Sequence, residues 1–156
     1  MLTRMQLLIP PPVWLMMAMG LAYVFSWLNH HFIAIYFPQW LISLRWAIVT
    51  LACGIASISV FGFFKARTTI NPHHPERSKH LLVDGIYRFS RNPMYLSLVM
   101  LLLAWCLHLQ AILSLFSIAW FVYAINQYQI KPEEVALREH FGEAYQQYCG
   151  KVRRWL

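Results

Sequence analysis

The sequence of 156 residues is 59% hydrophobic and 12% charged, whereas about 25% of the residues are charged in an average soluble domain. So small a polar fraction does not cover the surface of a soluble protein of this size, and the composition predicts one all-α domain, residues 1–156, in a membrane. The net charge of +7 arises from Lys and Arg residues between and after the apolar runs, which argues against the basic face of a nucleic-acid-binding module.

Two apolar runs in the N-terminal part, residues 1–64, approach the roughly 20 residues that a helix needs to span a bilayer. They cover residues 13–28 and residues 46–64. The segment between them, residues 32–44, is apolar and aromatic but is interrupted by Pro38. This pattern predicts two transmembrane helices joined by an interfacial or re-entrant segment.

A longer apolar run covers residues 93–125, with His108 and Gln110 at its middle. About 30 residues exceed one ordinary span, and the two polar residues favour a turn at that point. We therefore predict a helical hairpin of residues 93–107 and 111–127. A single long, tilted helix is the alternative.

The distribution of charge predicts the orientation of these four transmembrane helices. If the N-terminus faces the cytoplasm, every Lys and Arg lies on the cytoplasmic side except Arg45. Positive residues are enriched in cytoplasmic segments of membrane proteins, so both termini are predicted to be cytoplasmic. The compact size favours a bacterial inner membrane.

The residues from Lys131 onward predict an amphipathic cytoplasmic tail helix. Pro132 suits the first helical turn, and the carboxylates of Glu133 and Glu134 suit the positive end of the helix dipole. Gly142 is predicted to divide this helix into two pieces.

Polar groups gather in the loop before Pro93 and in the tail. Arg91 beside a helix start favours an anion site, and Gly85 permits close backbone approach to a ligand. The glutamate pair, Glu133 and Glu134, is suited to a cationic ligand. Each feature also has a simpler explanation: an arginine at this place commonly anchors a helix at lipid headgroups, and glutamates in a first turn commonly complement the helix dipole.

The order of the motifs carries a resemblance to a known family. The loop and tail contain, in order, Leu82-Val83, Gly85-Ile86-Tyr87, Arg91-Asn92-Pro93-Met94-Tyr95, Glu133-Glu134, Phe141-Gly142, Tyr145 and Tyr148. This arrangement resembles the isoprenylcysteine carboxyl methyltransferase and phospholipid methyltransferase superfamily. The resemblance implies a catalytic region in residues 65–156, with S-adenosylmethionine as the cofactor. It also implies a lipophilic acceptor, such as an isoprenylcysteine carboxylate or a lipid amine, that enters from the bilayer among the membrane lipids.

The resemblance further assigns roles to individual residues. The residues implied to bind the cofactor are His80, Leu82, Val83, Gly85, Tyr87, Arg91, Asn92, Pro93, Tyr95, Glu133 and Glu134. Of these, Arg91 and Glu134 are the implied catalytic residues. Arg91 would orient a carboxylate of the donor or acceptor, and Glu134 would stabilise the sulfonium or accept a proton. Asn92 replaces the His of the carboxyl methyltransferases, which leaves the acceptor open.

Two other functions remain as alternatives at this point. One is an NADPH-dependent membrane reductase of the steroid and sterol type, and the other is a non-catalytic membrane scaffold. No metal is predicted, because the histidine pairs His30-His31 and His73-His74 have no carboxylate or Cys partner at ligand spacing.

Overall fold

The computed structural model describes residues 9–65 and 81–156. These residues form helices and contain no β-structure beyond a single bridge between Tyr36 and Ala111, so the all-α prediction is confirmed. In chain order the elements are α2 (Pro11–Leu28), η1 (Asn29–Ile33), α3 (Gln39–Ser43), α4 (Arg45–Lys65), η3 (Gly85–Arg88), α5 (Pro93–His108), η4 (Ile112–Leu115), α6 (Phe116–Ile125), η5 (Asn126–Ile130) and α7 (Lys131–Lys151).

Two of the apolar helical segments are long enough to cross a membrane. They are Pro11–Ile33, which joins α2 to the π-helical turn η1, and Gln39–Gly62, which joins α3 to most of α4. Helix α5 is apolar but shorter. The predicted spans at residues 13–28 and 46–64 thus correspond to helices of suitable length and composition.

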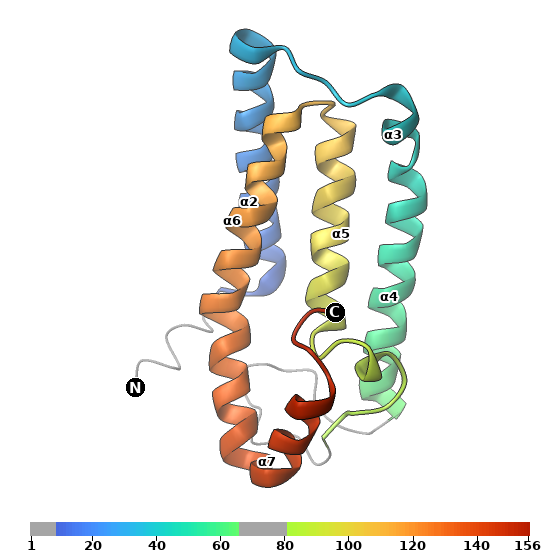
Figure 1. Ribbon diagram of the computed structural model, residues 1–156, viewed down its shortest axis with the longest axis vertical. Coiled ribbons are helices and arrows are strands. Elements are labelled where there is room, and N and C mark those ends of the chain that lie inside the picture. The colour runs from blue at the N-terminus through green and yellow to red at the C-terminus, as the bar shows by residue number, and fades with distance from the viewer. Residues whose placement is uncertain (1–8, 66–80) are drawn as a thin grey trace.

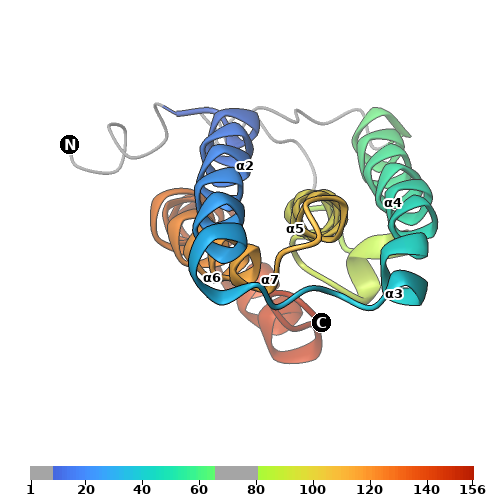
Figure 2. The same ribbon diagram turned by 90° about the horizontal axis from the view of Figure 1, so that it is seen from above.

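Helix α5 lies at the centre of the bundle. Figure 2 shows α4 on one side of α5 and the pair α2 and α6 on the other. Trp14, Ala18, Ala22 and Ser26 recur every four residues and form the buried stripe of α2. Because three of these side chains are small, α2 packs closely against α6, and Phe121 and Ile125 of α6 are fully buried there.

The predicted hairpin between α5 and α6 is present. Gln110 adopts a left-handed backbone conformation with φ 56°, which reverses the chain between the two helices. The side chain of Asn29 joins this turn to η1, since it donates to the Ile35 carbonyl and accepts from the Leu113 amide. A single long helix over residues 93–125 is therefore excluded.

The predicted boundary between the fourth helix and the tail helix is different in the structure. Helix α6 continues through the π-helical turn η5 into α7 without interruption (Figure 1). Pro132 has no backbone N–H to donate to the preceding turn. In a regular α-helix its ring would also clash with the carbonyl of the residue four positions earlier. The wider π-helical turn directly before it accommodates the ring, and so the chain extends as one helix out of the apolar bundle.

The predicted interruption at Gly142 is confirmed. Gly142 has φ 51° and ψ −122°, a backbone conformation that L side chains rarely adopt. The chain turns sharply there, and the second half of α7 returns toward the start of α5, where the C-terminus also lies (Figure 1). One glycine therefore directs the last residues of the chain back to the loop before α5.

Substitution of Gly142 by Ala is expected to destabilise the protein by roughly 2 kcal/mol, because the added Cβ disfavours this backbone conformation although no atom lies within 4 Å of it. Denaturant unfolding of the purified protein measures the change. Gly150→Ala is the matched control: Gly150 lies in the same helix with equally open space and without a positive φ, so its replacement is expected to be neutral or slightly stabilising. Equal effects at both positions would contradict this explanation.

Candidate functional site

The loop before α5 is shaped by one glycine and by the start of the helix. Gly85 has φ 63°, which begins the short 3₁₀ turn η3 and brings the chain back toward α5. Asn92 is the N-cap residue of α5 and Pro93 is its first residue, as predicted. The hydroxyl of Ser90 accepts the amide proton of Asn92, one of the backbone donors at the helix start that has no partner within the helix.

Aromatic side chains of α7 hold this loop in place. Tyr145, Tyr148 and Val152 form a small buried cluster against which Leu81 and Val83 pack. The hydroxyl of Tyr148 donates to the Tyr87 carbonyl at 2.7 Å. The loop and the second half of α7 therefore form one unit.

The last residues of the chain, 152–156, lie across the start of α5, and we call them the C-terminal strap. The Arg91 amide donates to the Arg153 carbonyl at 3.1 Å, and the Asn92 side chain donates to the Arg154 carbonyl at 2.9 Å. Trp155 packs against the main hydrophobic core. Hydrogen bonds to two main-chain carbonyls of the strap thus attach it to the loop that carries the predicted arginine.

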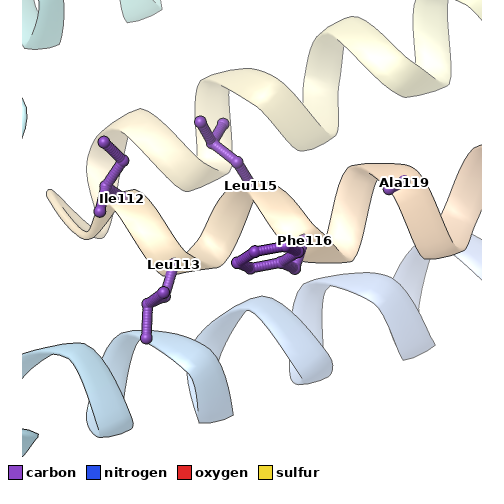
Figure 3. A pocket seen from close by; sticks show the side chains of 5 residues that line it. All are labelled: Ile112, Leu113, Leu115, Phe116 and Ala119. Atoms are coloured by element: carbon purple, nitrogen blue, oxygen red, sulfur yellow. The ribbon is translucent and has the colours of Figure 1, made fainter.

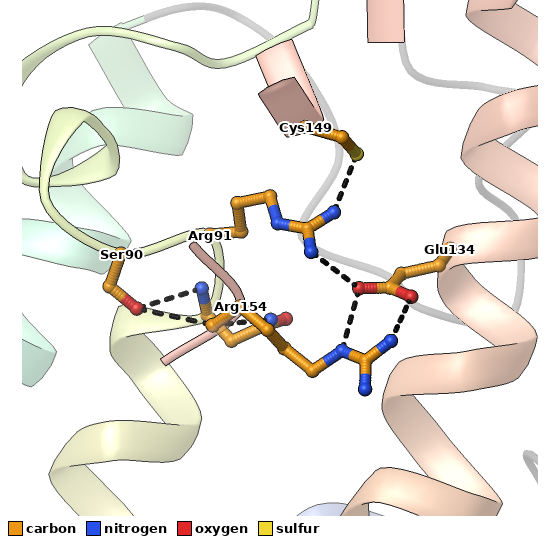
Figure 4. Close-up of polar contacts among 6 residues, drawn as sticks. Ser90, Arg91, Glu134, Cys149 and Arg154 are labelled. Carbon is orange, nitrogen blue, oxygen red and sulfur yellow. Dashed lines mark hydrogen bonds and ion pairs between the residues drawn. The ribbon is translucent and has the colours of Figure 1, made fainter. Parts of the chain in front are cut away.

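Three charged side chains, one of them from the strap, meet near the start of α5 (Figure 4). Arg154 donates from Nε and Nη2 to the two carboxylate oxygens of Glu134, at 2.9 and 2.7 Å. Nη2 of Arg91 lies 3.3 Å from Oε1 of Glu134. The side chains of Arg91 and Glu134 are 13% and 12% exposed, so this cluster is largely removed from water. Two guanidinium groups around one carboxylate leave a net positive charge.

Arg91 retains unused hydrogen-bonding capacity. Its Nη1 donates to Sγ of Cys149, whereas its Nε is buried and has no hydrogen-bond partner among the described residues. A buried donor without a partner is costly, and an acceptor group supplied by a ligand would remove that cost. The cluster is therefore suited to an anionic group.

Glu133 occupies a different environment from its neighbour. The Tyr95 hydroxyl donates to Oε1 of Glu133 at 2.5 Å. Burial raises the pKa of Glu133 to about 7; the hydrogen bond from Tyr95 lowers this pKa, and the negative charge of Glu134 raises it. Glu133 is thus held by a neutral partner and Glu134 by two cations.

The structure gathers some of the residues implied by the resemblance. Arg91, Asn92, Tyr95, Glu133 and Glu134 surround the start of α5. Leu82 instead lies against Gly62 of α4, and Val83 packs in the tyrosine cluster. The remaining residues, Gly85, Tyr87 and Pro93, shape or support the loop. His80 lies outside the described residues.

Three residues of this site received no role from the sequence. Arg154 is the second cation on Glu134, Cys149 contacts Arg91, and Ser90 accepts a hydrogen bond from the Asn92 amide. Arg154 gave a weak signal, since it forms a basic pair with Arg153 near the end of the tail. Cys149 and Ser90 gave none, because single Cys and Ser residues occur in many surroundings.

A second feature, a shallow apolar pocket, lies at the opposite end of the α5–α6 hairpin. Figure 3 shows its lining, which consists of Ile112, Leu113, Leu115, Phe116 and Ala119. Phe116 lies near Phe25 of α2, with 6.0 Å between the ring centroids. These lining side chains are all apolar, so this pocket offers no group to orient a charged ligand.

Comparison with known proteins identifies the family. The family model described as phospholipid methyltransferase matches residues 38–144. The chain belongs to the phospholipid methyltransferase family. The matched segment contains Arg91, Asn92, Glu133 and Glu134, whereas Arg154 and Cys149 lie beyond it. The superfamily resemblance of the motifs is thereby confirmed.

One relative among known proteins is an uncharacterised protein of Haemophilus influenzae. It is 49% identical over 63 residues, which are 40% of this chain and the whole length of that protein. No solved structure matches the chain. Membership of the phospholipid methyltransferase family implies a membrane methyltransferase in general terms, and leaves the acceptor undefined.

Proposed function

We propose that the protein transfers a methyl group from S-adenosylmethionine to a lipophilic acceptor resident in the membrane. The observation that carries this proposal is the meeting of Arg91 with Glu134 at the end of the α5–α6 hairpin, next to Glu133. These residues come from the two motifs that define the superfamily resemblance, and the fold brings them within contact distance. Family membership supports methyl transfer as the reaction.

The residues present fit a methyl donor that carries a carboxylate, an amino group and a sulfonium. The unused Nε of Arg91 suits the carboxylate, and the carboxylate of Glu133 suits a cationic group. S-adenosylmethionine supplies a methyl group already activated by the positive sulfur. Arg91 and the loop around Gly85 therefore have to bind and orient the donor, while the C-terminal strap excludes water. Glu134, already paired with two guanidinium groups, is suited to holding Arg91 in place.

The proposal includes four membrane spans with both termini in the cytoplasm. One end of the bundle is formed by η1, α3, the start of α4 and the hairpin turn (Figure 1), and Arg45, the first residue of α4, is the only Lys or Arg of the described residues in these elements. The other end is formed by η3, the start of α5 and the start of α7, with Arg88, Arg91 and Lys131 in or next to these elements, and Arg154 pairs with Glu134 there. This separation supports a cytoplasmic site in a bacterial inner membrane, reached by the acceptor from the bilayer.

Calorimetric titration of the detergent-purified protein with S-adenosylhomocysteine, with NADPH in parallel, tests the proposed donor. We expect saturable binding of S-adenosylhomocysteine alone. Arg91→Ala is expected to weaken this binding at least about tenfold, since a charged hydrogen bond contributes roughly 1.5–3 kcal/mol. Arg88→Ala is the control, because the Arg88 side chain is 72% exposed and pairs with Asp84.

Three outcomes would contradict the proposal. Binding of NADPH alone would assign the protein to the reductases. Binding of neither ligand would leave a scaffold as the better explanation. Unchanged affinity in Arg91→Ala would remove the assigned site while leaving the family intact.

A further inference from the structure

Arg45 lies at the end of the bundle opposite the candidate functional site. It is the first residue of α4, and it shares a face of that helix with Ala52, seven residues further on, which is fully buried. This face packs against α5, and Arg45 itself is half-buried. A partly buried charge is costly unless a counter-charge or hydrogen-bond partners compensate it.

The protein offers Arg45 no counter-charge at this end. All six Asp and Glu residues of the sequence follow residue 75, and Asp84, Glu133 and Glu134 lie at the other end of the bundle, in or next to η3 and α7. In the described part of the chain, no carboxylate forms an ion pair with Arg45. The counter-charge of Arg45 therefore has to come from outside these residues.

Most of the hydrogen-bond donors of the Arg45 guanidinium are also unused. Nη1 donates to the Ile42 carbonyl at a long 3.4 Å, and Cζ lies 5.5 Å from the centre of the Trp46 ring. Nε is buried without a hydrogen-bond partner among the described residues, and Nη2 makes no hydrogen bond to them either. Nε and Nη2 form the edge of a guanidinium that binds two oxygens side by side. In Arg154, the same edge holds both carboxylate oxygens of Glu134.

The surroundings of Arg45 have the composition of a membrane–water interface. Large aromatic side chains in or next to α2, η1, α3 and α4 are exposed at this end, namely Trp27, Phe32, Tyr36, Trp40 and Trp46. Trp and Tyr are enriched at the depth of the lipid headgroups. In the four-span arrangement proposed above, Arg45 therefore lies at the level of the phosphate groups of the leaflet opposite the candidate functional site.

We propose that Arg45 binds the phosphate of an anionic phospholipid in that leaflet. Two phosphate oxygens accept hydrogen bonds from Nε and Nη2, and the negative charge of the lipid compensates the charge that the chain leaves unpaired. The exposed aromatic side chains favour a lipid over a free anion, because they contact acyl chains that inorganic phosphate lacks. This inference rests on the membrane placement in the proposed function and is independent of methyl transfer.

Native mass spectrometry of the full-length, detergent-purified protein tests the inference. The protein is titrated with phosphatidylglycerol, and the Kd of the first bound lipid is measured. Arg45→Gln is expected to raise this Kd by about tenfold or more, because a charge-assisted contact through two hydrogen bonds is lost. Arg88→Gln is the matched control and should keep the wild-type Kd, since the Arg88 side chain is 72% exposed and pairs with Asp84 at the other end.

Arg45→Lys separates the geometry of the contact from its charge. Lys keeps the positive charge but lacks two parallel N–H groups, so its Kd is expected to lie between those of the wild type and Arg45→Gln. Thermal unfolding gives a second readout, because a lipid that binds the folded protein raises the unfolding temperature. The rise with phosphatidylglycerol should be smaller in Arg45→Lys than in the wild type. If Arg45→Gln does not fold, the comparison with Arg45→Lys decides the question.

Two further ligands identify the source of the phosphate. Diacylglycerol with the same acyl chains lacks the phosphate, and inorganic phosphate lacks the acyl chains. Neither is expected to raise the unfolding temperature at concentrations at which phosphatidylglycerol does so. Stabilisation by inorganic phosphate that Arg45→Gln abolishes would replace the lipid with a free anion, and equal stabilisation by diacylglycerol would remove the phosphate contact.

Equal Kd values for phosphatidylglycerol in the wild type and Arg45→Gln would overturn the inference, and equal values in the wild type and Arg45→Lys would exclude the contact through Nε and Nη2. The affinity for S-adenosylhomocysteine is expected to be the same in the wild type and Arg45→Gln, because Arg45 lies at the far end of the bundle. Loss of the lipid site and failure of the proposed methyl donor to bind are therefore separate results.

Discussion

Substitution of Glu134 by Ala is expected to lower the free energy of unfolding by about 3 kcal/mol, because it leaves two guanidinium groups side by side without a counter-charge. Arg91 is 13% exposed and has little access to compensating water. The same variant should bind S-adenosylhomocysteine much more weakly, since Arg91 loses the partner that positions it. Denaturant unfolding and calorimetric titration of the purified protein measure the two effects.

Two related variants distinguish this explanation from a general loss of packing. Arg154→Ala is expected to cost only about 1 kcal/mol, because Glu134 keeps Arg91 as a partner and Arg154 is 35% exposed. The double variant Glu134→Ala/Arg154→Ala should be more stable than Glu134→Ala alone, since one of the two unpaired cations is gone. A double variant less stable than Glu134→Ala would refute the charge-based account.

Substitution of Glu133 by Gln is expected to change how stability depends on pH. The pKa of Glu133 is about 7 in the folded protein against 4.5 for an unperturbed carboxyl. Between these values the folded protein holds a proton that the unfolded chain has released, so the contribution of Glu133 to stability falls as pH rises. This loss amounts to roughly 2–3 kcal/mol between pH 5 and pH 8.

The Gln variant lacks this titration. The free energy of unfolding of Glu133→Gln minus that of the wild type should therefore increase by roughly 2–3 kcal/mol from pH 5 to pH 8. Denaturant unfolding series at several pH values measure this difference. Glu143→Gln should run parallel to the wild type, because Glu143 is exposed. A constant difference between Glu133→Gln and the wild type from pH 5 to pH 8 would show that Glu133 titrates normally.

Much of the fold followed from local properties of the sequence. The length of the apolar runs located α2, α4 and α5, the polar residues at 108 and 110 located the hairpin turn, and Gly142 marked the sharp turn in α7. Helix length and a positive φ depend on residues that are close in the sequence, so one chain is enough to predict them. The continuity of α6 and α7 was not predicted, because the π-helical turn that accommodates Pro132 leaves no pattern in the residue types.

The sequence alone also located the two polar motifs and the family to which they belong. It did not determine which side chains pair. Glu133 and Glu134 are adjacent and chemically identical, yet one binds Tyr95 and the other binds two arginines. Arg154 joins the site only because the chain turns at Gly142 and the strap returns across α5. Ion pairing and burial depend on groups that are distant in the sequence, and so the tertiary structure alone decided the charge environment of each glutamate.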